Sequence, residues 1–195
     1  MHHISEHEDL RAQKSKQKVY DALTRLLKQQ SFEKISVAEI IREAGISRGT
    51  FYHHFKDKSH LVETYMKSVL GNFRQENATL TQQNLEGLLT DIFSLHTKES
   101  ALLAALLSDR GGLSVHHTIK SYMKKFATFK IAKADKNSTL TALEKDYISV
   151  FVVNAIFGVL QNWFARGQQE TPAQMADIIK KIISPYVLRI IAQAS

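Results

Sequence analysis

Residues 35–58, ISVAEIIREAGISRGTFYHHFKDK, decide the fold of this chain because they predict two short helices joined by one tight turn. Ser36 and Glu39 have the spacing of a capping box, so we expect the first helix to begin there. Gly45 supplies the backbone freedom that a sharp turn after a helix requires. Ser47 can then cap the second helix. Two capped helices around one glycine form a helix-turn-helix pattern.

The second of these helices has two contrasting faces. Phe51 and Phe55 lie about one turn apart and therefore point the same way, toward a core. The opposite face carries small, hydroxyl and imidazole side chains: Gly49, Thr50, Tyr52 and His53. Such a face suits DNA, because the backbone can approach closely and the polar groups reach phosphates and base edges. The alternative is a helical hairpin whose polar face merely lacks acids.

The segment AGISRGTFYHHFKDKSHL resembles the recognition region of the TetR family of bacterial transcriptional regulators. The matching positions are Ala44, Gly45, Ile46, Ser47, Gly49, Thr50, Phe51, Tyr52, His53, Phe55 and Lys58. The resemblance is close over roughly the first third of the chain, and the remainder is similar only in length and helical pattern. It implies a double-stranded DNA operator as partner. The implied contacts are Ser36, Ser47, Arg48, Gly49, Thr50, Tyr52, His53 and Lys58, of which we assign Tyr52 and Lys58 to phosphate.

Composition narrows the remaining function classes. The formal charge of +7 favours an anionic partner but does not separate nucleic acid from a membrane surface. The absence of cysteine excludes disulfides and thiolate metal sites and fits a cytoplasmic protein. We see no signal peptide after Met1. The longest apolar stretch, residues 150–160, is shorter than the ~20 residues of a membrane span, so we expect no membrane contact.

No pattern in the chain indicates catalysis. It has no GxSxG, P-loop or GxGxxG motif and no paired carboxylates at recognisable spacing. The adjacent His116 and His117 point to different helix faces, which makes them a poor bidentate pair. We therefore expect no enzyme, no cofactor and no metal site. The histidines near the N-terminus, His2, His3 and His7, are expected to lie in a frayed segment of about twelve residues.

Apolar periodicity predicts an all-α chain with an N-terminal three-helix head and a C-terminal helical body. We place the DNA-binding domain at residues 12–72 and the regulatory and dimerisation domain at 73–195. A helix over residues 58–79, about 30 Å long, links the two. Lysines near the start of the first helix face either solvent or the DNA backbone: Lys14, Lys16 and Lys18. Those on the helix over 114–132, including Lys120 and Lys130, are expected on its outer face.

The last two predicted helices, over residues 141–165 and from 171 onward, are too apolar for one protomer to cover. The first is apolar nearly all round, so two of its sides must be buried. The family resemblance implies that they pair with their copies in a four-helix homodimer interface. The alternative is that both lie inside the monomer. Pro185 is expected to kink or restart the last helix.

The resemblance further implies that the body holds a small-molecule pocket whose occupation changes the spacing of two DNA-reading heads. Candidate lining residues are Phe93, His96, Tyr122, Phe126, Asn154 and Phe157. Asn154, an amide in a run of valines and isoleucines, can equally be a packed core amide or a polar group that specifies the dimer. The sequence thus predicts a homodimeric, ligand-responsive repressor of a palindromic operator. One rival is a regulator or co-activator whose body docks a partner protein, and another is a membrane-surface role.

Overall fold

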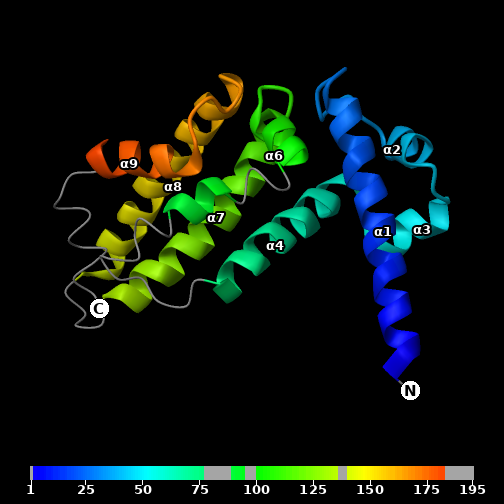
Figure 1. Cartoon of the computed structure of the whole chain (residues 1–195), viewed down its shortest axis with the longest axis horizontal. Helices are drawn as coiled ribbons and strands as arrows, with labels where there is room; N and C mark the ends of the chain where they lie inside the picture. The colour runs from blue at the N-terminus through cyan, green and yellow to red at the C-terminus, as the bar shows by residue number, and fades with distance from the viewer. Residues whose placement is uncertain (1, 77–88, 95–99, 136–139, 183–195) are drawn as a thin grey trace. The chain divides into compact units, whose positions relative to one another are not determined.

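The computed structural model describes residues 2–76, 89–94, 100–135 and 140–182, and all regular structure in these ranges is helical (Figure 1). The helices are α1 (His2–Leu27), α2 (Val37–Ala44), α3 (Arg48–His54), α4 (Lys58–Glu76), α6 (Ser100–Leu107), α7 (Gly112–Ala134), α8 (Ala142–Ala165) and α9 (Pro172–Ile182). Residues 89–94 form a further helical segment. The all-α prediction is confirmed. The predicted Pro185 kink and the candidate His96 lie outside the described residues.

The chain forms two compact units. The first combines Met1–Tyr65 with Ala101–His116, and the second combines Met66–Ser100 with His117–Ser195. The predicted boundary at residue 72 therefore falls inside α4, seven residues beyond the point where the units divide. Sequence reasoning also assigned all of residues 101–116 to the body, whereas this segment packs with the head.

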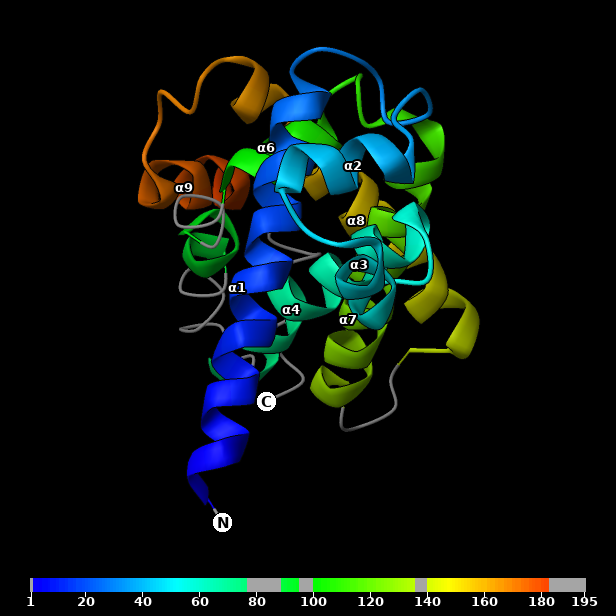
Figure 2. The ribbon, with the colours of Figure 1, turned by 90° about the vertical axis from the view of Figure 1, so that its right-hand side faces the viewer.

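The head is built around α1, with α2 and α3 packed against it (Figure 2). The predicted apolar stripe of α1 is buried: Val19, Ala22, Leu23, Leu26 and Leu27. The expectation of a frayed terminus is wrong, because α1 begins at His2. Residues 2–12 contain neither glycine nor proline, so nothing in them stops the helix from continuing back beyond its packed part.

The second unit has its core along α8 and α9. The buried residues of these helices are Ser149, Val153, Ile156, Phe157, Leu160, Trp163, Met175, Ala176 and Ile179. The ring of Phe93 meets Trp163 edge-on, with centroids 5.3 Å apart, and the indole N–H of Trp163 donates to the carbonyl of Glu170 at 3.1 Å. The indole therefore joins the helical segment 89–94 to α8 and to the turn that precedes α9.

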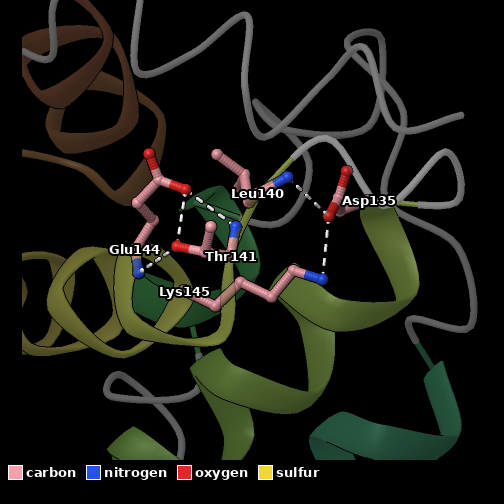
Figure 3. Close-up of polar contacts among 5 residues, drawn as sticks. All are labelled: Asp135, Leu140, Thr141, Glu144 and Lys145. Carbon is pink, nitrogen blue, oxygen red and sulfur yellow. Dashed lines mark hydrogen bonds and ion pairs between the residues drawn. The ribbon is translucent and has the colours of Figure 1, made fainter.

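The start of α8 is fixed by polar contacts on both sides of Thr141 (Figure 3). Thr141 and Glu144 form a capping box, with the carboxylate of Glu144 accepting from the backbone N–H and the hydroxyl of Thr141, both at 2.7 Å. The buried carboxylate of Asp135 accepts from Lys145 Nζ at 2.8 Å and from the backbone N–H of Leu140 at 3.2 Å. These bonds tie the end of α7 to the first turn of α8.

One face of α8 packs into the second unit, and another is exposed. The exposed apolar side chains are Leu143, Tyr147, Val150 and Phe151. Within the described ranges, α8 is also the one helix that is long and apolar enough to span a membrane. Trp163, which is 2% exposed, and the other buried residues of α8 hold one face of this helix in the core of the second unit.

Candidate nucleic-acid interface

The position of α2 is set by its capping box. The carboxylate of Glu39 accepts from the backbone N–H of Ser36 at 2.8 Å and from its hydroxyl at 2.7 Å, and Gln30 Nε2 donates to the other oxygen at 3.1 Å. These hydrogen bonds, the backbone one first, lower the pKa of Glu39 to about 2. The hydroxyl of Ser36 is thus engaged in starting α2, and the predicted contact of this exposed residue with DNA stays a prediction.

This capping box predicts a specific sensitivity to acid. Because folding lowers the pKa of Glu39 from its ordinary value of 4.5 to about 2, its contribution to stability is present above pH 4.5 and is lost as the pH falls toward 2. We expect Glu39→Gln to flatten the fall in melting temperature across this window. Thermal melting from pH 2 to 7 measures the effect, and Ser36→Ala should reproduce it. A Glu39→Gln variant that keeps the wild-type acid profile would contradict this assignment.

The turn between the motif helices requires its glycine. Gly45 has φ 62° and ψ 38°, and its N–H bonds back to the carbonyls of Ile41 and Arg42. A Cβ on Gly45 would meet nothing within 4 Å, so the requirement comes from the left-handed backbone rather than from space. Ser47 then caps α3, with Oγ accepting from the backbone N–H of Thr50 at 3.0 Å. Both features agree with the sequence interpretation.

The two faces of α3 lie as predicted. Phe51 and Phe55 are fully buried, with ring centroids 5.4 Å apart, and Phe55 also contacts Tyr20 of α1. The predicted DNA-facing side chains are exposed or half-buried: Ser47, Arg48, Thr50, Tyr52 and His53, with the Gly49 backbone beside them. The head therefore presents hydroxyl, guanidinium and imidazole groups from one short helix that aromatic packing holds in place.

His54 is a residue of this surface that the sequence interpretation left out. Its ring is half-buried and meets the ring of His53 with centroids 5.0 Å apart. Burial, followed by the charges of His53 and Lys16, lowers the pKa of His54. The sequence signal that could have identified His54 is its position next to His53 at the end of α3.

Lys58 has a different place from the one that its match to the family motif suggested. Its ammonium donates to three backbone carbonyls, those of Phe32 at 2.8 Å, Glu33 at 3.0 Å and Ile35 at 3.0 Å, and it lies over the ring of Phe32. These bonds use all three N–H donors of a lysine. In the structure Lys58 therefore holds the loop before α2, rather than leaving its charge free for a phosphate.

The candidate pocket residues occupy unlike environments. Phe93 and Phe157 are buried, whereas Tyr122 and Phe126 are half-buried. Asn154 is exposed, which excludes the packed core amide in this chain; its Oδ1 accepts from Lys120 Nζ at 2.9 Å, and its Nδ2 donates to the carbonyl of Val150. The sequence could not predict this exposure, because a helix that is apolar nearly all round does not reveal which of its faces lies outermost.

Four lysines of α7 were expected on its outer face, and three of them, Lys120, Lys125 and Lys130, lie over the ring of a candidate pocket residue. Lys120 Nζ lies 4.5 Å from the ring centroid of Phe157, and Lys130 Nζ lies 5.4 Å from that of Phe126. Lys130 is only 6% exposed, so the expectation of a solvated face is wrong for it. The long aliphatic stem and the cation–π contact explain how a lysine is accommodated there.

Comparison with known proteins finds two family models that together match most of the chain. The model of the bacterial regulatory protein tetR family matches residues 19–65, and that of a transcriptional regulator C-terminal region matches residues 83–185. The regulator AcrR of Shigella flexneri is 46% identical over 50 residues, which span 26% of this chain and 23% of AcrR. An HTH-type transcriptional regulator of Staphylococcus aureus (strain USA300) is 25% identical over 156 residues, 75% of this chain and 82% of that protein.

Solved structures agree on the fold. A TetR transcriptional regulator from Streptococcus agalactiae 2603V superposes with a TM-score of 0.61 at 20% identity, covering 96% of this chain and 99% of that one. FadR of Bacillus subtilis, solved in complex with stearoyl-CoA, gives 0.57 at 17% identity, covering 92% and 98%. The helix-turn-helix geometry and the two family matches lead to one conclusion: the chain belongs to the tetR family of bacterial regulatory proteins and is a DNA-binding transcriptional regulator.

Proposed function

We propose that the chain is a cytoplasmic, ligand-responsive repressor that binds a palindromic operator as a homodimer, without a catalytic role. The observation that carries this proposal is the combination of two surfaces on one chain. The head presents the α3 face, and α8 carries an apolar face that the described residues of its own unit leave exposed.

The α3 face supports sequence reading with a simple division of labour. Arg48 is exposed at the first position of α3 and can reach a guanine edge, whereas Tyr52 and His53 lie further along the helix and suit phosphate. The hydroxyl of Thr50 bonds to Ser47 at 2.8 Å, so in the absence of DNA these two groups satisfy each other. Gly49 lets the helix backbone approach a groove.

The apolar face of α8 supports a homodimer. Tyr147 is 67% exposed and Phe151 is 60% exposed, one turn apart, and two isoleucines of α9, Ile178 and Ile182, are also exposed. Soluble proteins rarely leave such contiguous side chains in water unless they form an interface. Asn154 lies on the same face of α8. Of the roles that the sequence left open for Asn154, a polar group that specifies the dimer therefore fits its position best.

A homodimer fixes the form of its DNA site. Two recognition helices related by a two-fold axis reach successive major grooves when the half-sites lie about 34 Å apart, or a multiple of that distance. We expect selection from a random duplex library to yield an inverted repeat, with footprints on both half-sites at two chains per duplex. A single asymmetric half-site bound by one chain would refute the palindromic operator.

We propose a small, at least partly apolar effector that binds the body and lowers operator affinity. Support comes from the aromatic side chains Phe93, Phe126 and Phe157 in the second unit, since such residues commonly line ligand pockets. An effector that prefers the non-binding state by about 1.4 kcal/mol per protomer reduces affinity about tenfold per protomer.

The effector is tested by a metabolite and drug screen that follows thermal melting, with operator binding measured for each compound that raises it. We expect Phe126→Trp to weaken the response to such a compound while the chain still folds and binds the selected operator. A screen without any stabilising compound would contradict the effector. The partner-protein alternative would then take its place, with a copurified protein rather than a small molecule as its mark.

A further inference from the structure

The loop between α1 and α2, residues 28–35, is contacted by a segment about 80 residues away in sequence. We call this segment, residues 108–112, the α6–α7 corner, because it leads from the end of α6 into the first residue of α7; Figure 1 shows it beside the loop. The backbone N–H of Phe32 donates to the carbonyl of Arg110 at 2.8 Å. Arg110 Nη1 in turn donates to the carbonyl of Leu27 at 3.3 Å and to that of Lys28. A guanidinium thus caps the carboxyl end of α1, where free carbonyls favour a cation.

The α6–α7 corner has a fixed shape of its own. The N–H of Gly111 donates to the carbonyl of Ser108 at 2.9 Å, and the ring of His116 hydrogen-bonds the same carbonyl at 3.0 Å. A Cβ on Gly111 would lie 1.9 Å from the carbonyl oxygen of Leu106, so only glycine fits there. Gly112 has φ +77°, a left-handed backbone that strains other residues. The corner is therefore a preformed support rather than a loose turn.

The same loop is held from another side by α4. Lys58 Nζ donates to the carbonyls of Phe32, Glu33 and Ile35. The peptide groups of Phe32 are thus engaged in both directions, with the N–H bonded to the corner and the carbonyl bonded to α4. Ser36, the residue after Ile35, begins α2 through its capping box. The loop that sets the start of α2 is clamped by two elements other than the motif helices α2 and α3.

We propose that the α6–α7 corner is a positioning element for operator binding, in which Arg110 holds the loop so that α2 and α3 keep the geometry that DNA requires. The side chain of Arg110 acts through the carbonyls of Leu27 and Lys28. By fixing the start of the loop it also supports the bond from the N–H of Phe32 to the main-chain carbonyl of Arg110. This role involves no contact with DNA. Without the side chain of Arg110 the head spends less time in the arrangement that binds DNA. The apparent affinity then falls in proportion to the population of that arrangement. The inference rests on DNA binding by the motif and is independent of the effector and of the sign of regulation.

The test compares Arg110→Ala with Asp109→Ala, an exposed neighbour on the same corner. The probe is a fluorescent duplex carrying the site that the wild-type chain selects from a random library. We expect Arg110→Ala to bind it about tenfold more weakly per head, with an unchanged dimer and an unchanged dependence of affinity on salt. Amide hydrogen exchange should speed up at Phe32 and in α2, whereas Asp109→Ala should match the wild type.

Three outcomes would overturn the proposal. One is an Arg110→Ala variant that binds within twofold of the wild type although exchange at Phe32 is faster. Another is a salt slope lower by about one unit, which would make Arg110 a direct phosphate contact. The third is equal weakening by Asp109→Ala. If Arg110→Ala unfolds at the assay temperature, Arg110→Lys, which can still reach one carbonyl, is judged by the same measurements and should bind between the wild type and the fully weakened level.

Discussion

Replacing Phe151 with aspartate is expected to convert the protein into a monomer and to abolish high-affinity operator binding. In the proposed dimer each of two symmetric copies would bury an unpaired carboxylate in place of an aromatic ring that is 60% exposed in the isolated chain. At about 2 kcal/mol or more per copy, the association would weaken by roughly a thousandfold. A monomer binds one half-site only, so the advantage of bridging two half-sites is lost as well.

Sedimentation equilibrium measures the oligomeric state of this variant, and circular dichroism confirms that it remains helical. Leu113→Asp is the matched control, because Leu113 is an apolar side chain that is 87% exposed on a different helix, α7. It should leave the dimer intact. If Phe151→Asp stays dimeric at micromolar concentration, the exposed face of α8 is not the interface, and a partner protein becomes the better occupant.

The second large effect concerns Lys58. We expect Lys58→Met to destabilise the head by about 3 kcal/mol, because three charge-assisted hydrogen bonds are lost and three carbonyls are left without their partner. For a unit of this size the melting temperature should fall by about 10–20 °C. Thermal melting checks this directly. Lys56→Met, a change at an exposed lysine two residues earlier, should stay within about 0.5 kcal/mol of the wild type.

Binding measurements on the same variant separate the two roles considered for this lysine. A phosphate contact predicts that the slope of log K against log salt becomes shallower by about one unit. The carbonyl contacts predict an unchanged slope with a lower affinity, since the loop before α2 is loosened without loss of a neutralised phosphate. A shallower slope together with wild-type melting would restore Lys58 to the list of DNA contacts.

The sequence predicts the motif well because its determinants are local. The capping box of Ser36 and Glu39, the left-handed Gly45 and the paired Phe51 and Phe55 all act within a few residues, and the structure confirms each of them. Such short-range signals do not depend on what the remainder of the chain packs against.

The long-range contacts could not be predicted in the same way. Arg110 reaches the end of α1 from about 80 residues away, and nothing in its neighbours indicates that partner. Lysine chemistry suits a carbonyl cluster as well as a phosphate, so the match of Lys58 to the motif could not decide its partner. Asn154 shows a further limit, because in a helix that is apolar all round the sequence does not reveal which side faces outward.

The hydrogen bonds that Lys58 and Arg110 make to the loop before α2 all go to main-chain atoms of the loop, and this has a consequence for which substitutions the loop tolerates. The N–H of Phe32 and the carbonyls of Phe32, Glu33 and Ile35 are present whatever side chains these positions carry, short of proline. We therefore expect exposed positions in the loop, such as Lys34, to tolerate substitution. The constraint on substitution falls instead on Lys58 and Arg110, the two residues that reach into the loop. We expect either of them to be replaced only where the backbone path of the loop changes as well.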